Sequence, residues 1–217
     1  MAKVGADFAW RMEDVLDTYA HPYDVAYPVI CFDEKSYQLQ DHVNAPQPAA
    51  PGRLRRIDYE YKRCGTANLF MAFEPLTGQR CVSVTERRGN AEFTAQMQCL
   101  HLRYPHAAKI RVVLDQLSTH SPAAFYQYLP PDEARQLTQR FEWIYTPKHA
   151  SWLNMAEMEW SVLERQCLGQ RLHSEQALID QVTAWQSERN RQVIAVNWQF
   201  SAITARQTMT RHYPSRI

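Results

Sequence analysis

Two aspartates each follow a short apolar run in this sequence of 217 residues. Asp33 comes directly after VICF, and Asp115 comes directly after RVVL. Runs of this kind are typical of strands that are buried on both faces. Parallel strands end at one edge of a sheet, and Mg²⁺ is commonly held there by carboxylate oxygens together with substrate phosphate. One such aspartate is more often a turn or cap residue, but two on neighbouring strands predict a shared cation site.

A third carboxylate is expected from the segment 152–168, whose apolar residues recur at helical spacing. At ~100° per residue, the apolar stripe consists of Ala156, Trp160, Leu163 and Cys167. The polar stripe beside it consists of Asn154, Glu157, Ser161 and Glu164. Glu159 lies ~200° from Glu157, so the two cannot face one site. This geometry favours Glu157 as the third ligand. An ordinary amphipathic helix with solvated glutamates has the same periodicity and stays open as the alternative.

The remaining composition argues against zinc, disulfides and a membrane span. The five cysteines are scattered and form no CxxC pair, which predicts reduced thiols, with Cys31 as a small buried hydrophobe. No apolar run approaches the ~18 residues that a membrane span needs, and the N-terminus lacks a signal pattern. We therefore expect a cytoplasmic protein.

The elements that must position the carboxylates alternate between helix and strand. The sequence predicts strands at 29–32, 67–73, 81–85 and 143–145, and one that ends at Asp115. It predicts helices at 8–19, 91–102, 152–168 and 174–191, and a further helix start at Ser121-Pro122. The stretch 44–52 has three prolines and a glycine, and is predicted to be a loop rather than a domain boundary. This order favours a mixed α/β sheet covered by helices.

Charge is uneven along the chain, although the net charge is only +1. The segment 52–63 gathers five basic residues: Arg53, Arg55, Arg56, Lys62 and Arg63. Such a cluster could neutralise the phosphates of a DNA backbone. A solvated surface is the commoner explanation of any single cluster, so this site is a weak prediction.

Several segments, in order along nearly the whole chain, resemble the transposases of bacterial insertion sequences in the Tc/mariner-like superfamily. They are CFDEKSYQL, DYEYKRCGTANLFMAFEPLTG, VVLDQLSTH, YTPKHASWLNMAEMEWSVLERQCL and NWQFSAITARQTM. The most specific is TPKHASWLN, followed by Glu157. The resemblance implies an RNase H-like mixed five-stranded sheet flanked by helices, the fold of DDE superfamily endonuclease domains. It also implies that Asp33, Asp115 and Glu157 are the catalytic and metal-binding triad.

The resemblance further implies a reaction and its partners. Two Mg²⁺ or Mn²⁺ ions would assist cleavage of transposon-end phosphodiesters and transfer of the 3′-hydroxyl into target DNA at a TA dinucleotide. Double-stranded DNA is the expected partner, bound by a homodimer in the bacterial cytoplasm close to the nucleoid. The matched motifs also contain residues that could support the triad or contact phosphate: Gln116, His120, Lys148, His149 and Asn154. For His120, a helix-start role before Ser121 is weighed equally.

Two departures from the family pattern bear on activity. Gln116 stands where the family usually has asparagine, and the longer amide is expected to bond nearby at some cost in activity. Residues 1–24 are predicted to form a linker helix and 25–217 the catalytic domain, without the upstream helix-turn-helix region of relatives. The chain would then be one frame of a split gene or a truncated remnant. The alternatives are a stand-alone RNase H-like nuclease and a non-catalytic remnant with a DNA-binding or regulatory role.

Overall fold

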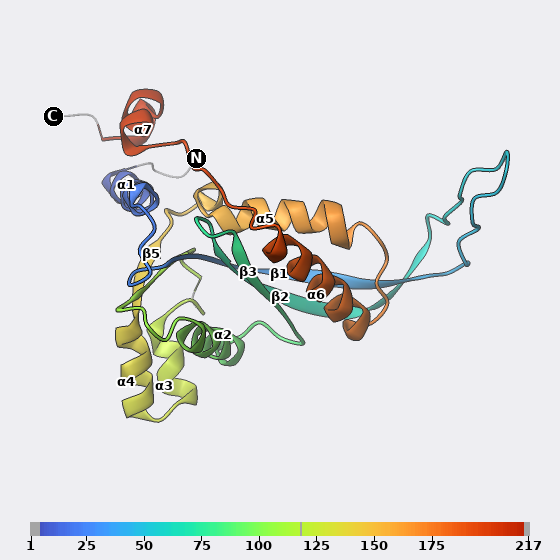
Figure 1. Cartoon of the computed structure of the whole chain (residues 1–217), viewed down its shortest axis with the longest axis horizontal. Helices are drawn as coiled ribbons and strands as arrows, with labels where there is room; N and C mark the ends of the chain where they lie inside the picture. The colour runs from blue at the N-terminus through green and yellow to red at the C-terminus, as the bar shows by residue number, and fades with distance from the viewer. Residues whose placement is uncertain (1–4, 118, 215–217) are drawn as a thin grey trace.

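The computed structural model describes residues 5–117 and 119–214, which build one five-stranded mixed sheet (Figure 1). The strand order is β3-β2-β1-β4-β5. β1 runs antiparallel to β2 and parallel to β4, β2 is antiparallel to β3, and β4 is parallel to β5. The strands span Val29–His42, Tyr61–Glu74, Gln79–Thr85, Ile110–Leu114 and Phe141–Tyr145. The predicted mixed five-stranded sheet is confirmed.

Helices cover both faces of the sheet, and each face has its own hydrophobic cluster. On one face lie α1 (Ala6–Ala20), α5 (Met155–Leu163), α6 (Glu175–Arg191) and α7 (Ala202–Thr208). On the other lie α2 (Asn90–Arg103), α3 (Phe125–Tyr128) and α4 (Pro131–Arg140). A 3₁₀ turn, Pro122–Ala124, precedes α3 and is capped by the Ser121 hydroxyl, as the Ser-Pro pair predicts.

The apolar run before Asp33 is buried on both sides, as predicted. Successive side chains of a strand point to opposite faces. Ile30 and Phe32 therefore enter the cluster beneath α2 to α4, while Cys31 enters the cluster beneath α5. Val113 of β4, the register partner of Cys31, faces the α5 side too. Asp33 and Asp115 lie two residues beyond Cys31 and Val113, so their side chains are expected to point toward α5 as well.

Asp33 does not stand at the end of its strand, and this part of the prediction is wrong. β1 continues for nine residues beyond Asp33, to His42. Its pairing with β4 ends at Cys31 and Val113, whereas its pairing with β2 runs on to the end of the strand. Asp33 therefore lies where β1 loses β4 as a neighbour. The position is open on one side because β4 is short.

The basic segment also differs from its prediction, because β2 begins at Tyr61 rather than at 67. Lys62 and Arg63 are consequently strand residues. Residues 43–60, here called the arm, join β1 to β2 and project away from the rest of the molecule (Figure 1). Arg171 fixes the base of the arm by donating hydrogen bonds to the backbone oxygens of Asp58 (2.6 Å), Tyr59 (3.1 Å) and Glu60 (2.7 Å).

The helix predicted at 152–168 is divided into three parts. A 3₁₀ turn spans Ser151–Leu153, α5 follows from Met155, and a π-helical turn spans Glu164–Leu168. Asn154 separates the first two parts because its side chain accepts a hydrogen bond from the Ala156 N–H and caps α5. The apolar stripe expected from Ala156 to Cys167 is buried throughout.

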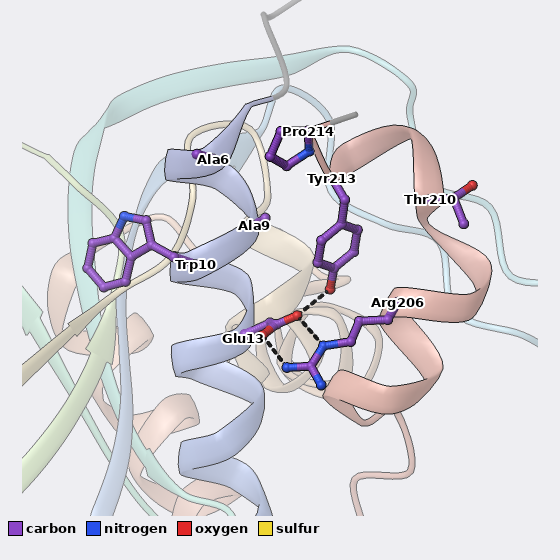
Figure 2. A pocket seen from close by; sticks show the side chains of 8 residues that line it. All are labelled: Ala6, Ala9, Trp10, Glu13, Arg206, Thr210, Tyr213 and Pro214. Atoms are coloured by element: carbon purple, nitrogen blue, oxygen red, sulfur yellow. Dashed lines mark hydrogen bonds and ion pairs between the residues drawn. The ribbon is translucent and has the colours of Figure 1, made fainter. Parts of the chain in front are cut away.

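The N-terminal helix packs on the C-terminal segment (Figure 2). Arg206 of α7 forms a two-pronged ion pair with Glu13 of α1, and the Tyr213 hydroxyl donates to the same carboxylate at 2.8 Å. Met12 and Val15 of α1 reach the cluster beneath α5. The division at residues 24 and 25 stays a prediction. Among the described residues, no helix has the length and apolar character needed to span a membrane.

Candidate active site

Asp33 is held in place from α5. The indole N–H of Trp160 donates a hydrogen bond to Asp33 Oδ2 at 3.0 Å. The pKa of Asp33 is raised to about 7, chiefly by burial. The negative charges of Glu157 and Asp115 contribute to this rise, while hydrogen bonds from the Glu34 backbone and from Trp160 oppose it. Glu157 and Asp115 therefore lie near enough to Asp33 for their charges to affect its pKa.

Asp115 is held from its own loop. Asp115 Oδ1 lies 2.6 Å from His120 Nδ1 and accepts a hydrogen bond from the Leu117 N–H at 3.2 Å. His120 is 1% exposed. Burial lowers the pKa of His120, but its hydrogen bonds to Asp115 and Glu34 outweigh that effect and raise the pKa to about 9. An imidazolium therefore lies against the carboxylate.

Glu157 lies in the first turn of α5, whose start is tied to β1. The Asn154 amide donates to the backbone oxygen of Phe32 at 2.8 Å, one residue before Asp33. The Trp160 bond to Asp33 starts one helical turn after Glu157. These two bonds set both the height and the rotation of α5 over β1, and Glu157 is only half-buried there. The helix therefore presents Glu157 to the same neighbourhood as the two aspartates.

The three acids suit a hard divalent cation by their chemistry. All three offer carboxylate oxygens as ligands, and Asp33 is a partly buried carboxylate beside two further negative charges, which a cation would offset. As the side chains are placed, however, no three His, Cys, Asp or Glu residues in the described part of the chain are close enough to hold one ion together. Asp33 is turned to Trp160, and Asp115 to His120. The residues are neighbours rather than an assembled coordination shell.

The other predicted site residues occupy different surroundings. Gln116 donates a hydrogen bond to the Thr146 backbone oxygen at 3.0 Å, so the longer amide does bond nearby, linking the ends of β4 and β5. Asn154 is 3% exposed and engaged in the two bonds already described. Lys148 and His149 are exposed in the loop after β5. Asn154 and Gln116 thus support the backbone, whereas Lys148 and His149 face solvent.

Comparison with known proteins decides the family. A family model described as DDE superfamily endonuclease matches residues 28–179, which is more than half of the chain. The chain belongs to this family. A search of curated proteins finds no match. The confirmed family and its fold are those expected from the resemblance to Tc/mariner-like transposases, while a bacterial origin stays a prediction.

Solved structures share the RNase H-like fold of this endonuclease. The crystal structure of the Mos1 mariner paired end complex with Mn matches with a TM-score of 0.58 and 15% identity, over 87% of this chain and 57% of that one. The Mos1 strand transfer complex matches with a TM-score of 0.58 and 14% identity, over 87% of this chain and 56% of that one. The endonuclease chain thus spans less than two thirds of the Mos1 chain.

Sequence reasoning missed two residues connected to the predicted acids, one directly and one through His120. Trp160 was assigned to the apolar stripe, yet its N–H reaches Asp33. Glu34 received no role, yet its carboxylate lies 3.2 Å from His120 Nε2. The alternation of a strand offered a signal for Glu34, because a charged residue next to Asp33 must point into the opposite, buried face.

The raised pKa of Asp33 predicts how the stability of the endonuclease depends on pH. A folded-state pKa of about 7, above the ordinary 3.8, means that the folded chain holds this proton more tightly than the unfolded chain. The stabilisation is complete below the ordinary value and is lost as pH rises through the folded-state value. Without divalent cations, we expect the Tm to fall between about pH 4 and about pH 7, and to fall less in Asp33→Asn. Equal slopes in thermal unfolding would contradict the prediction.

Proposed function

We propose that this chain is the catalytic domain of a DNA transposase. It cleaves a phosphodiester at a transposon end and joins the freed 3′-hydroxyl to target DNA, with a TA dinucleotide as the expected target. One observation carries the proposal: Asp33 of β1, Asp115 just after β4 and Glu157 of α5 lie near enough to one another for the last two charges to raise the pKa of Asp33, in a member of the DDE superfamily endonucleases. Double-stranded DNA and a second copy of the chain are the proposed partners, and an upstream helix-turn-helix product is the proposed source of end recognition.

Asp33, Asp115 and Glu157 would hold the cations, with Mg²⁺ or Mn²⁺ as a pair of ions. When bound, such ions activate the attacking oxygen and stabilise the leaving oxygen of an in-line displacement at phosphorus. The contribution of the chain is positional. Trp160 and His120 each fix one oxygen of an aspartate, and Asn154 holds the start of α5 beside β1. In the cleavage step water attacks phosphorus and the 3′-oxygen of the transposon end leaves as the freed 3′-hydroxyl. In the joining step that hydroxyl attacks a phosphodiester of the target and displaces the 3′-oxygen of the target strand.

Two assays test the proposed reaction. Nicking of supercoiled plasmid in Mg²⁺ reports cleavage, and joining of a pre-cut end to a plasmid reports strand transfer. The wild-type chain is expected to do both, and Asp115→Ala neither. Cleavage without joining would favour a stand-alone RNase H-like nuclease. Absence of both activities, with DNA binding intact, would favour a regulatory remnant.

The arm offers a surface for the DNA backbone. Arg53, Arg55 and Arg56 are all exposed on it. Leu54 and Tyr59, 87% and 86% exposed, add apolar and aromatic side chains to the same surface. Arg171 holds the arm at its base, so the charges are presented on a fixed support. We propose that the arm, together with Lys62 and Arg63, contacts phosphates without reading sequence.

Neutralising the arm should change the salt dependence of DNA binding. We expect the combined Arg53→Gln, Arg55→Gln and Arg56→Gln variant to reduce the slope of log K against log salt by up to about three, because each lost phosphate contact removes ~0.9. The matched control replaces the exposed Arg103 and Arg135, on α2 and α4, and should leave the slope unchanged. Fluorescence anisotropy with labelled duplex measures both. Equal slopes in the arm variant and the wild type would remove the arm from the interface.

A further inference from the structure

Glu34 is a buried acid that the proposed reaction does not use directly. It follows Asp33 in β1, and its side chain is 4% exposed. Because neighbouring strand residues point to opposite faces, Glu34 points away from α5 toward the face that carries Phe32. There its Oε2 lies 3.2 Å from His120 Nε2. Arg88, whose side chain is 52% exposed, approaches Glu34 Oε1 only to 3.9 Å.

His120 connects Glu34 to Asp115. Its two ring nitrogens lie 3.2 Å from Glu34 Oε2 and 2.6 Å from Asp115 Oδ1. The ring is enclosed by aromatic side chains, with the Phe93 centroid at 5.2 Å and the Phe32 centroid at 5.8 Å. The His120 backbone is fixed as well, since its N–H donates to the Leu117 oxygen and its own oxygen accepts from the Tyr145 hydroxyl at 2.9 Å.

We propose that Glu34 is a positioning residue that orients the Asp115 carboxylate through His120. The inference rests on the proposed function, because orientation of Asp115 matters only if Asp115 holds a cation. Asp115 follows the end of β4 in a loop, and its side chain is 38% exposed, so packing alone does not fix its torsions. The hydrogen bonds from His120 and Leu117 converge on Oδ1 and thereby direct Oδ2 away from them.

The arrangement follows the general design of metal sites. A ligand is commonly oriented by a hydrogen-bond partner behind it, and loss of that partner typically costs about 10–100-fold in metal affinity or activity. Two hydrogen bonds in series, from Glu34 to His120 and from His120 to Asp115, can hold the Asp115 carboxylate in one orientation because His120 is itself fixed. Here His120 packs against Phe93 and Phe32 and is tethered at its backbone. Removing Glu34 leaves one ring nitrogen without its partner and frees the ring to turn.

The test compares Glu34→Leu with Glu34→Gln in the full chain. Mn²⁺ binding without DNA is followed by the loss of the free-ion electron paramagnetic resonance signal, and plasmid nicking is measured separately. We expect Glu34→Leu to raise the Kd for Mn²⁺ about 10–100-fold. Glu34→Gln should stay within a few-fold of the wild type, because its amide can still bond His120 Nε2. Arg88→Gln is the matched control and should bind Mn²⁺ as the wild type does.

A second pair of variants keeps the test informative if Glu34→Leu does not fold. His120→Asn can retain the bond to Asp115 but not the one to Glu34, whereas His120→Gln can retain the bond to Glu34 but not the one to Asp115. The proposal predicts weaker Mn²⁺ binding than the wild type in both variants, because each breaks one of the two bonds that connect Glu34 to Asp115. A wild-type Kd in His120→Asn, or an unchanged Kd in a folded Glu34→Leu, would overturn it. Asp115→Ala separates the two proposals: nicking by that variant would refute the proposed function itself.

Discussion

Replacing Glu157 with glutamine is expected to reduce DNA cleavage by roughly 10³-fold or more, the scale reached when one preorganised electrostatic group is lost from a site of this kind. The physical reason is the loss of one of the two negative charges that lie near Asp33. Folding should not suffer, because Glu157 is half-buried and its charge raises the pKa of Asp33. Single-turnover nicking in Mg²⁺ measures the rate, and urea unfolding measures the stability.

Glu164 provides the matched control for this substitution. It lies on the same polar stripe of the predicted helix, but its exposed carboxylate pairs with Lys35 instead of facing Asp33. Glu164→Gln should therefore cleave DNA at nearly the wild-type rate. If Glu157→Gln nicks plasmid within tenfold of the wild type, the triad is assigned to the wrong residue. If both variants lose activity, the loss reflects damage to the helix and not the loss of a catalytic group.

Local periodicity separates Glu157 from Glu159 within their segment, whereas the family resemblance is needed to separate Glu157 from Glu164. The stripe of Ala156, Trp160 and Leu163 has to face the sheet, and the positions of the other side chains on α5 follow from that. The same reasoning places Asp33 and Asp115 on one face, because they follow Cys31 and Val113 at strand spacing. Pattern alone therefore predicts a mixed α/β sheet covered by helices, and the resemblance adds its five-stranded RNase H-like form.

Features that depend on the length of a neighbouring strand could not be predicted from the sequence. Whether Asp33 ends a strand depends on where β4 stops, and nothing near Asp33 in the sequence records that. The bond of His120 to Glu34 joins residues 86 positions apart and forms only once β1 and β4 are paired. β2 was predicted too short for a related reason. Its first residues are exposed and polar, and they are strand because β1 offers a partner.

Glu159 shows the same limit, and it has a structural role that its neighbour Glu157 lacks. The helical geometry directed Glu159 away from the site without indicating what it would meet. In the structure it is 3% exposed and pairs with two arginines. Arg189 of α6 donates to both of its oxygens at 2.8 and 3.2 Å. Arg80 of β3, fully buried, has its Nε 3.1 Å from Glu159 Oε2, an ion pair without hydrogen-bond geometry.

Removing the Glu159 carboxylate should therefore destabilise the chain far more than removing that of Glu157. In Glu159→Ala, two buried guanidinium groups lose their only carboxylate among the described residues, and breaking a buried pair from one side costs about 3–5 kcal/mol. That is a large part of the total stability of a typical domain. Arg80 would keep its bonds to Asn190 and to the Ile194 oxygen, which cannot neutralise its charge. Urea unfolding at neutral pH measures the loss.

Glu188 is the matched control, because it pairs with Arg191 on α6 at 2.7 Å, close to the shorter Arg189–Glu159 bond of 2.8 Å but on the exposed surface. Glu188→Gln should leave the unfolding midpoint unchanged, since solvent and salt screen such pairs. Cleavage per folded molecule should survive in Glu159→Ala, as the Asn154 and Trp160 bonds still hold α5 to β1. A wild-type midpoint in Glu159→Ala would mean that water reaches the two arginines. A folded but inactive Glu159→Ala would mean that this buried ion pair also sets the rotation of α5, and with it the direction of Glu157.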